Sequence, residues 1–213
     1  MNRIMILIFV LIFFSISYLK AENTNFKPMK DTSAFKQKLL ELSKTTNSIS
    51  SAFTQVKYLS FMSEKMTTKG LFFFKKINQL RWEYTEPYKY LIVISNGKIV
   101  IKDENKTNRY DIESNKMFKE INDIMLNTVQ GNILNSKEFK IVFYDNNEHF
   151  IAQLFPRTKK MKEYLNNITI YFDKKDYSVA KIKMTELSGD YTDINFHNKK
   201  MNTQIPDEKF IVK

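Results

Sequence analysis

Cysteine is absent from this chain of 213 residues, and histidine occurs only twice. Without cysteine the protein forms no disulfide and has no thiolate nucleophile or thiolate metal ligand, so its fold depends on a hydrophobic core alone. His149 and His197 lie in strand-like segments without the spacing of a metal site. No glycine-rich phosphate loop is present, and Ser188, Gly189 and the acidic pairs lie in turns, where structural roles far outnumber catalytic ones. These absences argue against an enzyme, and no metal or cofactor is expected.

The chain also lacks a concentrated stripe of charge. Its net charge is +11, and a basic balance can indicate binding to nucleic acid or to an anionic membrane. Here the lysines lie beside glutamates and aspartates, and the whole chain is rich in Lys, Asn and Ile with only four Gly. The charge therefore reflects overall composition, and no nucleic-acid partner is expected.

Only one long apolar run occurs, over residues 4–14, behind Arg3 and ahead of a polar, small-residue stretch that ends near Ala21. This order is typical of a secretory signal peptide, and the run is too short to span a membrane. Cleavage is expected after Ser17 or after Ala21, and an uncleaved N-terminal anchor is the alternative. The sequence therefore predicts an exported protein.

These boundaries divide the chain into a signal peptide, 1–21, and a single soluble domain, 22–213. That length is enough to bury a substantial core in one domain. Residues 22–30, with mixed polar side chains and Pro28, are expected to form a mobile leader before the first regular element.

Helical spacing of apolar residues occurs in two longer segments. Phe35, Leu39 and Leu42 recur at i, i+4 and i+7, which predicts an amphipathic helix over 32–42. A second helix is predicted in the middle of the chain, with Ser114 as its N-cap and Gly131 as its C-terminal stop. Its apolar positions are Met117, Phe118, Ile121, Ile124, Met125 and Val129. A short helix is also predicted at 159–165.

The rest of the chain is typical of antiparallel strands, because short segments rich in aromatic and β-branched residues alternate with turn residues. The strongest hairpin signal is Asn96-Gly97, since both residues tolerate the positive φ of a type I′ turn. A meander of about nine to eleven strands must curl into a barrel or split into a sandwich. The predicted strands are 52–60, 66–75, 79–84, 89–95, 99–101, 110–112, 139–144, 150–155, 168–172, 178–186 and 191–196.

Large apolar side chains are more abundant than a half-buried sheet requires: the chain has 18 Phe, 11 Tyr and 10 Met. The run from Leu71 to Phe74 is apolar on both faces of its strand, where one-sided burial would alternate. Two interpretations remain open. The sheet is covered on both faces, or it forms a barrel with an apolar lumen that the two predicted helices close as a lid, where Met suits variable cargo.

Several segments resemble the LolA family of outer-membrane lipoprotein carriers. They are Ala52 to Gln55, Gly70 to Trp82 with its Leu-Arg-Trp ending, Tyr84, Pro87, Ser95 to Lys98, and Ile205-Pro206 with Phe210. The resemblance covers essentially the mature chain. It implies a mainly β fold with an α-helical lid, in which an incomplete antiparallel barrel, a half-barrel, encloses an apolar cavity for lipoprotein acyl chains.

Residue roles follow from this resemblance and from strand alternation. In the family a basic residue, usually Arg followed by Pro, latches the lid; here it is Lys76 followed by Ile77, and lysine lacks the planar fork of arginine. Leu80, two residues before Trp82, is expected to face the cavity. The cavity residues are expected to be Phe72, Phe74, Leu80, Trp82, Tyr90, Ile92 and Ile94. The lid residues are expected to be Phe35, Leu39, Met117, Phe118, Ile121, Ile124 and Met125.

The resemblance implies a monomeric periplasmic carrier that shuttles lipoproteins from the inner to the outer membrane. Its implied partners are lipoprotein acyl chains, an inner-membrane lipoprotein-releasing transporter and an outer-membrane acceptor. The acceptor role itself is disfavoured, because the family's acceptor is a lipoprotein and this chain has no cysteine to be acylated. The alternatives are a carrier for another lipid or glycolipid in a specialised envelope pathway, and a lipoprotein-sensing regulatory module.

Overall fold

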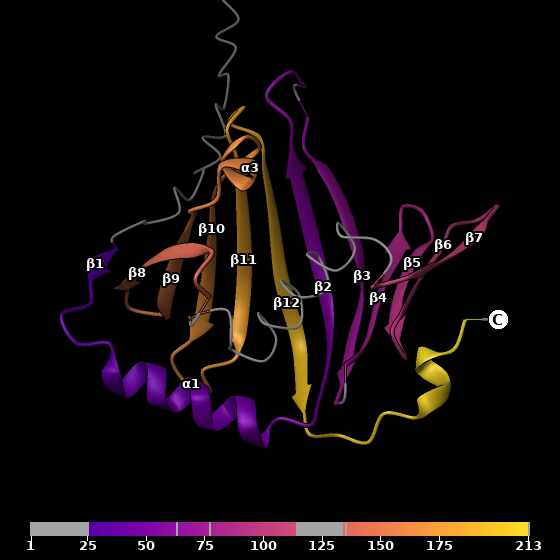
Figure 1. Cartoon of the computed structure of the whole chain (residues 1–213), viewed down its shortest axis with the longest axis horizontal. Coiled ribbons are helices and arrows are strands. Elements are labelled where there is room, and N and C mark those ends of the chain that lie inside the picture. Colours follow the sequence, from indigo (N-terminus) through magenta and orange to yellow (C-terminus); the bar gives the residue numbers. More distant parts are fainter. Residues whose placement is uncertain (1–25, 63, 77, 114–133, 135, 213) are drawn as a thin grey trace, which may run out of the picture.

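The computed structural model describes residues 26–62, 64–76, 78–113, 134 and 136–212. Twelve strands form one antiparallel sheet in the order β1-β8-β9-β10-β11-β12-β2-β3-β4-β5-β6-β7 (Figure 1). The strands are β1 (Lys27–Pro28), β2 (Ser48–Tyr58), β3 (Met66–Lys75), β4 (Gln79–Glu86), β5 (Tyr90–Ser95), β6 (Lys98–Lys102), β7 (Thr107–Asp111), β8 (Phe139–Asp145), β9 (His149–Pro156), β10 (Leu165–Asp173), β11 (Val179–Glu186) and β12 (Tyr191–Met201). The helices are α1 (Ser33–Thr45), α3 (Lys159–Lys162) and the 3₁₀ helix η2 (Asp207–Phe210).

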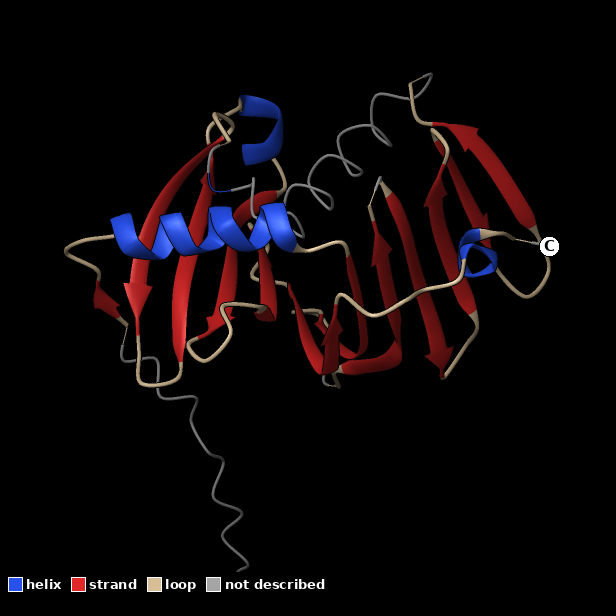
Figure 2. Ribbon diagram, turned by 90° about the horizontal axis from the view of Figure 1, so that it is seen from below, coloured by secondary structure: helices blue, strands red, loops and turns tan. Residues whose placement is uncertain are grey.

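The sheet is curved and open, with β1 at one edge and β7 at the other, so the predicted half-barrel is confirmed (Figures 1 and 2). Every strand predicted from the sequence coincides with or overlaps a strand of the sheet. In the middle of the sheet β12 pairs with β2. This pairing joins the C-terminal meander, β8 to β12, to the N-terminal meander, β2 to β7. Among the described residues, no helix combines the length and the apolar character needed to cross a membrane.

The prediction of a mobile leader over residues 22–30 is wrong for Lys27 and Pro28, which belong to the sheet. Lys27 and Pro28 form β1 and pair with Asp145 and Tyr144 of β8. The amide of Met29 also donates to the carbonyl of Phe143 at 3.0 Å. A two-residue strand that contains proline carries no periodicity of its own, so only its partner strand reveals it.

The Asn96-Gly97 turn has the predicted geometry. Asn96 has φ of 51° and Gly97 has φ of 72°, and Ser95 pairs with Lys98 across the turn. These angles belong to a type I′ turn, whose twist matches that of the flanking strands. The turn therefore fixes the register of β5 against β6.

The inner face of the sheet carries two apolar clusters. One is centred on β8, β9 and β10, and α1 packs on it through Phe35 and Leu39, which are spaced i, i+4 and are both buried. Figure 2 shows α1 crossing this half of the sheet. The other cluster spans β2 to β6 and β12, and it contains six of the seven predicted cavity residues, all except Tyr90. The second helix predicted from the sequence, and the signal peptide, lie outside the described residues.

A third cluster lies on the outer face of β3, β4 and β5. The residues that pack there are Ile205, just before η2, and Phe210, the last residue of η2. They contact Val93 and the half-buried Phe73. Phe73 pairs with Arg81 and is one residue out of phase with Phe72 and Phe74, so it points to the opposite face. The apolar character of both faces of β3 therefore has two causes, an inner cluster and a cover formed by the C-terminal segment.

Candidate functional site

The seven predicted cavity residues all lie on the inner face of neighbouring strands. Residues that pair across antiparallel strands point to the same side of the sheet. The pairing joins Phe72 to Trp82 and Ile92 in one row, Phe74 to Leu80 and Ile94 in a second row, and Tyr84 to Tyr90 in a third. The predicted alternation is thus present in the strand register.

Burial divides these residues into two groups. Phe74 is 1% exposed and Leu80 is fully buried, and Phe72, Trp82 and Ile94 are also buried. Tyr90 and Ile92 remain half-buried. The accessible residues therefore lie in the first half of β5, at Tyr90 and Ile92, whereas Ile94 later in the same strand is buried.

Four buried aliphatic or aromatic residues that sequence reasoning did not assign to the site extend the same cluster: Phe53, Ile99, Ile112 and Ile194. Ile99 could have been found, because it pairs with Ile94 across the predicted Asn96-Gly97 turn. Ile194 could not, because its row depends on the pairing of β12 with β2, two segments far apart in the chain.

Aromatic rings dominate the centre of the cluster. The ring of Trp82 lies 4.6 Å from that of Phe53, 5.5 Å from that of Phe72 and 6.1 Å from that of Phe196, measured between centroids. Phe53 fits because its cross-strand partner is Gly70. A Cβ atom on Gly70 would lie 2.0 Å from the carbonyl oxygen of Glu83 and 2.6 Å from the Phe53 ring. The glycine of the family-like segment therefore makes room for a ring.

Polar groups also lie on this face, and those of Tyr84 and Trp82 lie among its aromatic rings. The hydroxyl of Tyr84 donates to Oε1 of Gln55 at 3.0 Å. Burial raises the pKa of Tyr84 above its ordinary value, although the nearby Trp82 indole partly opposes the rise, so the phenol stays neutral. The indole Nε1 of Trp82 is buried and makes no hydrogen bond of good geometry to any described residue. Its contact with the Tyr84 phenol lowers the pKa of that phenol but falls short of good hydrogen-bond geometry, so the indole keeps a donor that a better-placed oxygen would satisfy.

The predicted lid residues Phe35 and Leu39 belong to α1, but they cover the other half of the inner face. Phe35 is 3% exposed, and its ring lies 4.9 Å from Phe150 and 5.4 Å from Phe172. These contacts place it in the cluster of β8 to β10 and not in the cluster of the seven cavity residues. The other predicted lid residues, Met117, Phe118, Ile121, Ile124 and Met125, lie outside the described residues.

Lys76 joins α1 to the end of β3. Its ammonium donates to the carbonyl oxygens of Ser43 at 3.1 Å and Lys44 at 2.9 Å, both in the last turn of α1. The backbone amide of Lys76 also donates to the carbonyl of Asn47 at 2.9 Å. A cation at the C-terminus of a helix pairs with carbonyls that have no partner in the helix and with the negative end of its dipole.

A family model described as outer membrane lipoprotein carrier protein LolA matches residues 44–213. The chain belongs to the LolA family. No curated protein sequence matches the chain.

Solved structures are similar to this LolA-family chain at low identity. An uncharacterised conserved protein from Thermus thermophilus superposes with a TM-score of 0.51 at 8% identity, over 84% of this chain and 93% of that one. A LolA superfamily protein from Nitrosomonas europaea gives a TM-score of 0.44 at 10% identity, over 83% and 97%. The lipoprotein LppX from Mycobacterium tuberculosis gives 0.42 at 8%, over 81% and 96%.

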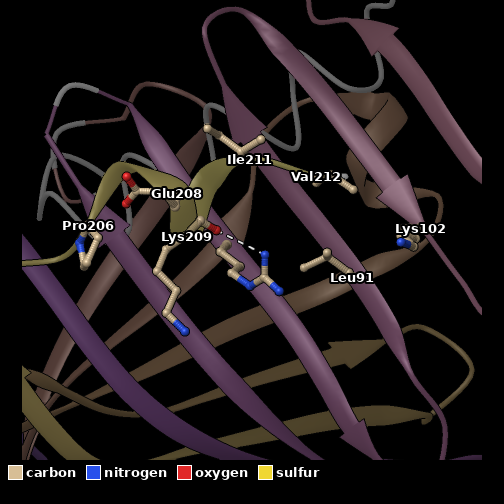
Figure 3. Close-up of a pocket in the computed structure, with 8 residues that line it drawn as sticks. Leu91, Lys102, Pro206, Glu208, Lys209, Ile211 and Val212 are labelled. Atoms are coloured by element: carbon tan, nitrogen blue, oxygen red, sulfur yellow. Dashed lines mark hydrogen bonds between the residues drawn. The ribbon is translucent and has the colours of Figure 1, made fainter.

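This LolA-family chain also has a pocket of about 580 Å³ on the outer face of the sheet (Figure 3). The C-terminal segment forms one wall, and β4, β5 and β6 form the other. Nη1 of Arg81 donates to the carbonyl of Lys209 at 3.1 Å and ties the two walls together. The lining residues are Arg81, Leu91, Lys102, Pro206, Glu208, Lys209, Ile211 and Val212. The pocket lies on the face opposite the seven cavity residues and was not predicted from the sequence.

Proposed function

We propose that this chain is a periplasmic carrier that binds lipoprotein acyl chains on its apolar inner face and shuttles them from the inner to the outer membrane. The observation that carries the proposal is the apolar inner face of β2 to β6 in a chain of the LolA family. Each methylene removed from water is worth about 0.8 kcal/mol, so an acyl chain does not cross the aqueous space unshielded.

Binding in this proposal requires no covalent step. Acyl chains enter among Phe72, Trp82 and Ile92, starting from the accessible first half of β5. The buried N–H of Trp82, which has no well-directed partner, then donates to a carbonyl oxygen of the cargo, such as an ester or amide at the head of an acyl chain. In this proposal apolar contact supplies most of the affinity, and the hydrogen bond from the Trp82 indole adds to it.

In this proposal the lid over the cavity residues is the mid-chain segment that carries Met117, Phe118, Ile121, Ile124 and Met125, and α1 covers the neighbouring half of the inner face. Lys76 acts as a latch, because it holds the C-terminal end of α1 against the end of β3. Of these two hydrogen bonds one is exposed and the other part-buried, and in this proposal both break when the cargo arrives. In the envelope the carrier receives cargo from an inner-membrane lipoprotein-releasing transporter and delivers it to an outer-membrane acceptor.

The test is to express the full chain with its own leader, purify it from the cell envelope and identify bound ligands by native mass spectrometry. A soluble one-to-one complex with a triacylated protein is the expected result. Free glycolipid or another lipid alone would replace the lipoprotein proposal with a specialised lipid carrier. Retention of the chain in the membrane fraction by an uncleaved leader would contradict the signal-peptide assignment.

A further inference from the structure

Large apolar side chains are strongly exposed at one end of the sheet, the end opposite α1. Phe61 is 79% exposed in the turn between β2 and β3, and Met62 beside it is 37% exposed. Leu187 is 60% exposed in the turn between β11 and β12, and Tyr164 is 53% exposed between α3 and β10. Figure 1 shows these three connections at the same end of the molecule.

Hydrogen bonds join the three connections into one surface. The amide of Ser60 donates to Oδ1 of Asp190 at 2.7 Å, which ties the β2–β3 turn to the β11–β12 turn. The amide of Leu187 donates to the carbonyl of Tyr164 at 3.3 Å, which ties that turn to the segment after α3. We call the surface formed by Phe61, Met62, Tyr164 and Leu187 the apolar end.

Contacts within and just below the turns fix the position of the apolar end. Asp190 accepts the Ser60 amide, which lowers the pKa of its carboxyl and keeps that contact charged at neutral pH. The rings of Tyr58 and Tyr191, just below, stack with centroids 5.1 Å apart. Phe61, three residues after Tyr58, is thus exposed to solvent and is not part of the hydrophobic core.

Lysines surround the apolar end. Three of the four residues of α3 are lysines, at 159, 160 and 162, and all three are exposed. Lys65 and Lys183 lie over the ring of Tyr191 at 5.7 Å and 4.4 Å from its centroid. The nearby acids are fewer than these lysines: Asp190 accepts the Ser60 amide and Glu186 pairs with Lys57 at 2.9 Å. Asp193 lies opposite Lys183 in the strand register, and Glu64 and Glu163 are the other acids close by in the sequence.

We infer that the apolar end docks the protein on an anionic lipid bilayer. Phe61 and Leu187 enter the interface between headgroups and acyl chains, Tyr164 lies at headgroup level, and the lysines contact the anionic headgroups. Exposed apolar residues flanked by lysine and aromatic side chains are the chemistry that binds such an interface. This docking goes beyond the proposed cargo, since it serves a carrier of any lipid taken from or delivered to a membrane.

Sedimentation with vesicles tests the inference, using the chain purified from the cell envelope. Vesicles of phosphatidylglycerol and phosphatidylethanolamine are compared with vesicles of phosphatidylcholine alone. Binding is expected on the anionic vesicles and to weaken with added salt, because ionic screening shortens the reach of the lysines. The double variant Phe61→Ser/Leu187→Ser is expected to bind these vesicles at least about tenfold more weakly, since two apolar side chains no longer enter the interface.

The matched control is Ile211→Ser, because Ile211 is 60% exposed like Leu187 but lies in the C-terminal segment. It is expected to leave vesicle binding unchanged. Lys159→Gln/Lys162→Gln should reduce the difference in binding between anionic and neutral vesicles.

No vesicle binding by the unaltered chain, or equal loss of binding in the end variant and the control, overturns the inference. Normal acyl-probe binding by the end variant separates this failure from a failure of the proposed carrier function. Loss of delivery without loss of vesicle binding assigns the surface to a protein partner and also overturns the inference.

Discussion

At the residue scale, Gly70 shows how closely the strands approach beneath the aromatic centre of the inner face. Its neighbours leave no room for a methyl group, since a Cβ atom there would lie 2.0 Å from a backbone oxygen. Relief would require β3 and β4 to separate, because the obstructing atom belongs to the backbone of Glu83 and not to a flexible side chain. The packing of Phe53 and Trp82 depends on that spacing.

We predict that Gly70→Ala lowers the free energy of unfolding by about 1–3 kcal/mol, as overpacking of a core does. Denaturant unfolding followed by the fluorescence of the single Trp82 measures the change, and altered packing should shift the emission of the folded state. Gly97→Ala is the control: its φ of 72° makes alanine strained, by about 1 kcal/mol, but nothing lies within 4 Å. An unshifted emission in Gly70→Ala would contradict this account of the packing.

Lys76 gives a second prediction at this scale. Lys76→Met keeps the length of the side chain but removes both hydrogen bonds to the last turn of α1, so stability should fall by about 1 kcal/mol. Hydrogen exchange of the α1 amides should speed up more than exchange in β4. Lys76→Arg should restore slow exchange, because guanidinium also donates to carbonyls. Equal exchange in Lys76→Met and the unaltered chain would remove the latch from the proposal.

At the element scale, the C-terminal segment has a structural role that its sequence conceals. Phe210 is 4% exposed and packs with Ile205 and Val93 on the outer face of the sheet. Lys75 forms an ion pair with Asp207, and Arg81 donates to Lys209, so polar contacts align the segment on β3 and β4. This segment covers the outer face of β3 to β5, whereas α1 covers the inner face of β8 to β10.

We predict that Phe210→Ala lowers the free energy of unfolding by about 3 kcal/mol, the usual cost of truncating a buried phenylalanine. Ile211→Ala, one residue later and 60% exposed, should change it by less than about 0.5 kcal/mol. Urea unfolding of the two variants measures the difference. Similar stabilities would show that the segment is not part of the folded core.

Elements with local signals were predictable from the sequence, and contacts between distant segments were not. The strand predicted at 66–75 has the same bounds as β3, and the Asn96-Gly97 turn has its predicted type, since neighbouring residues determine both. The shared face of Leu80 and Trp82 followed from strand alternation. The pairing of β1 with β8, the cover of η2 on Val93 and the position of α1 away from the cavity residues depend on contacts across most of the chain.

At the scale of the whole molecule, the open sheet has two edges that need protection from other chains. β1 is two residues long and ends in Pro28, which cannot donate to a further strand. β7 exposes Arg109 and Asp111, and charges on an edge strand oppose pairing with a second copy. We predict a monomer: light scattering after size-exclusion chromatography should give the mass of one chain at every concentration, and a concentration-dependent dimer would contradict this.

Ligand binding should stabilise the whole fold, because acyl chains that bind the folded inner face have no equivalent site on the unfolded chain. A triacylated lipopeptide at a hundredfold excess over its dissociation constant should add about 2.7 kcal/mol and raise the melting temperature.

Ile92 and Leu91 provide a matched pair to locate that effect, since they are adjacent, both half-buried and on opposite faces of β5. Ile92 is the better inner-face probe than Leu80, because a charge at the fully buried Leu80 would destabilise the protein itself. Ile92→Glu should therefore melt at the same temperature with and without lipopeptide, whereas Leu91→Glu should retain the increase. If Leu91→Glu lost the increase and Ile92→Glu kept it, the acyl chains would bind on the outer face, beside the pocket under the C-terminal segment.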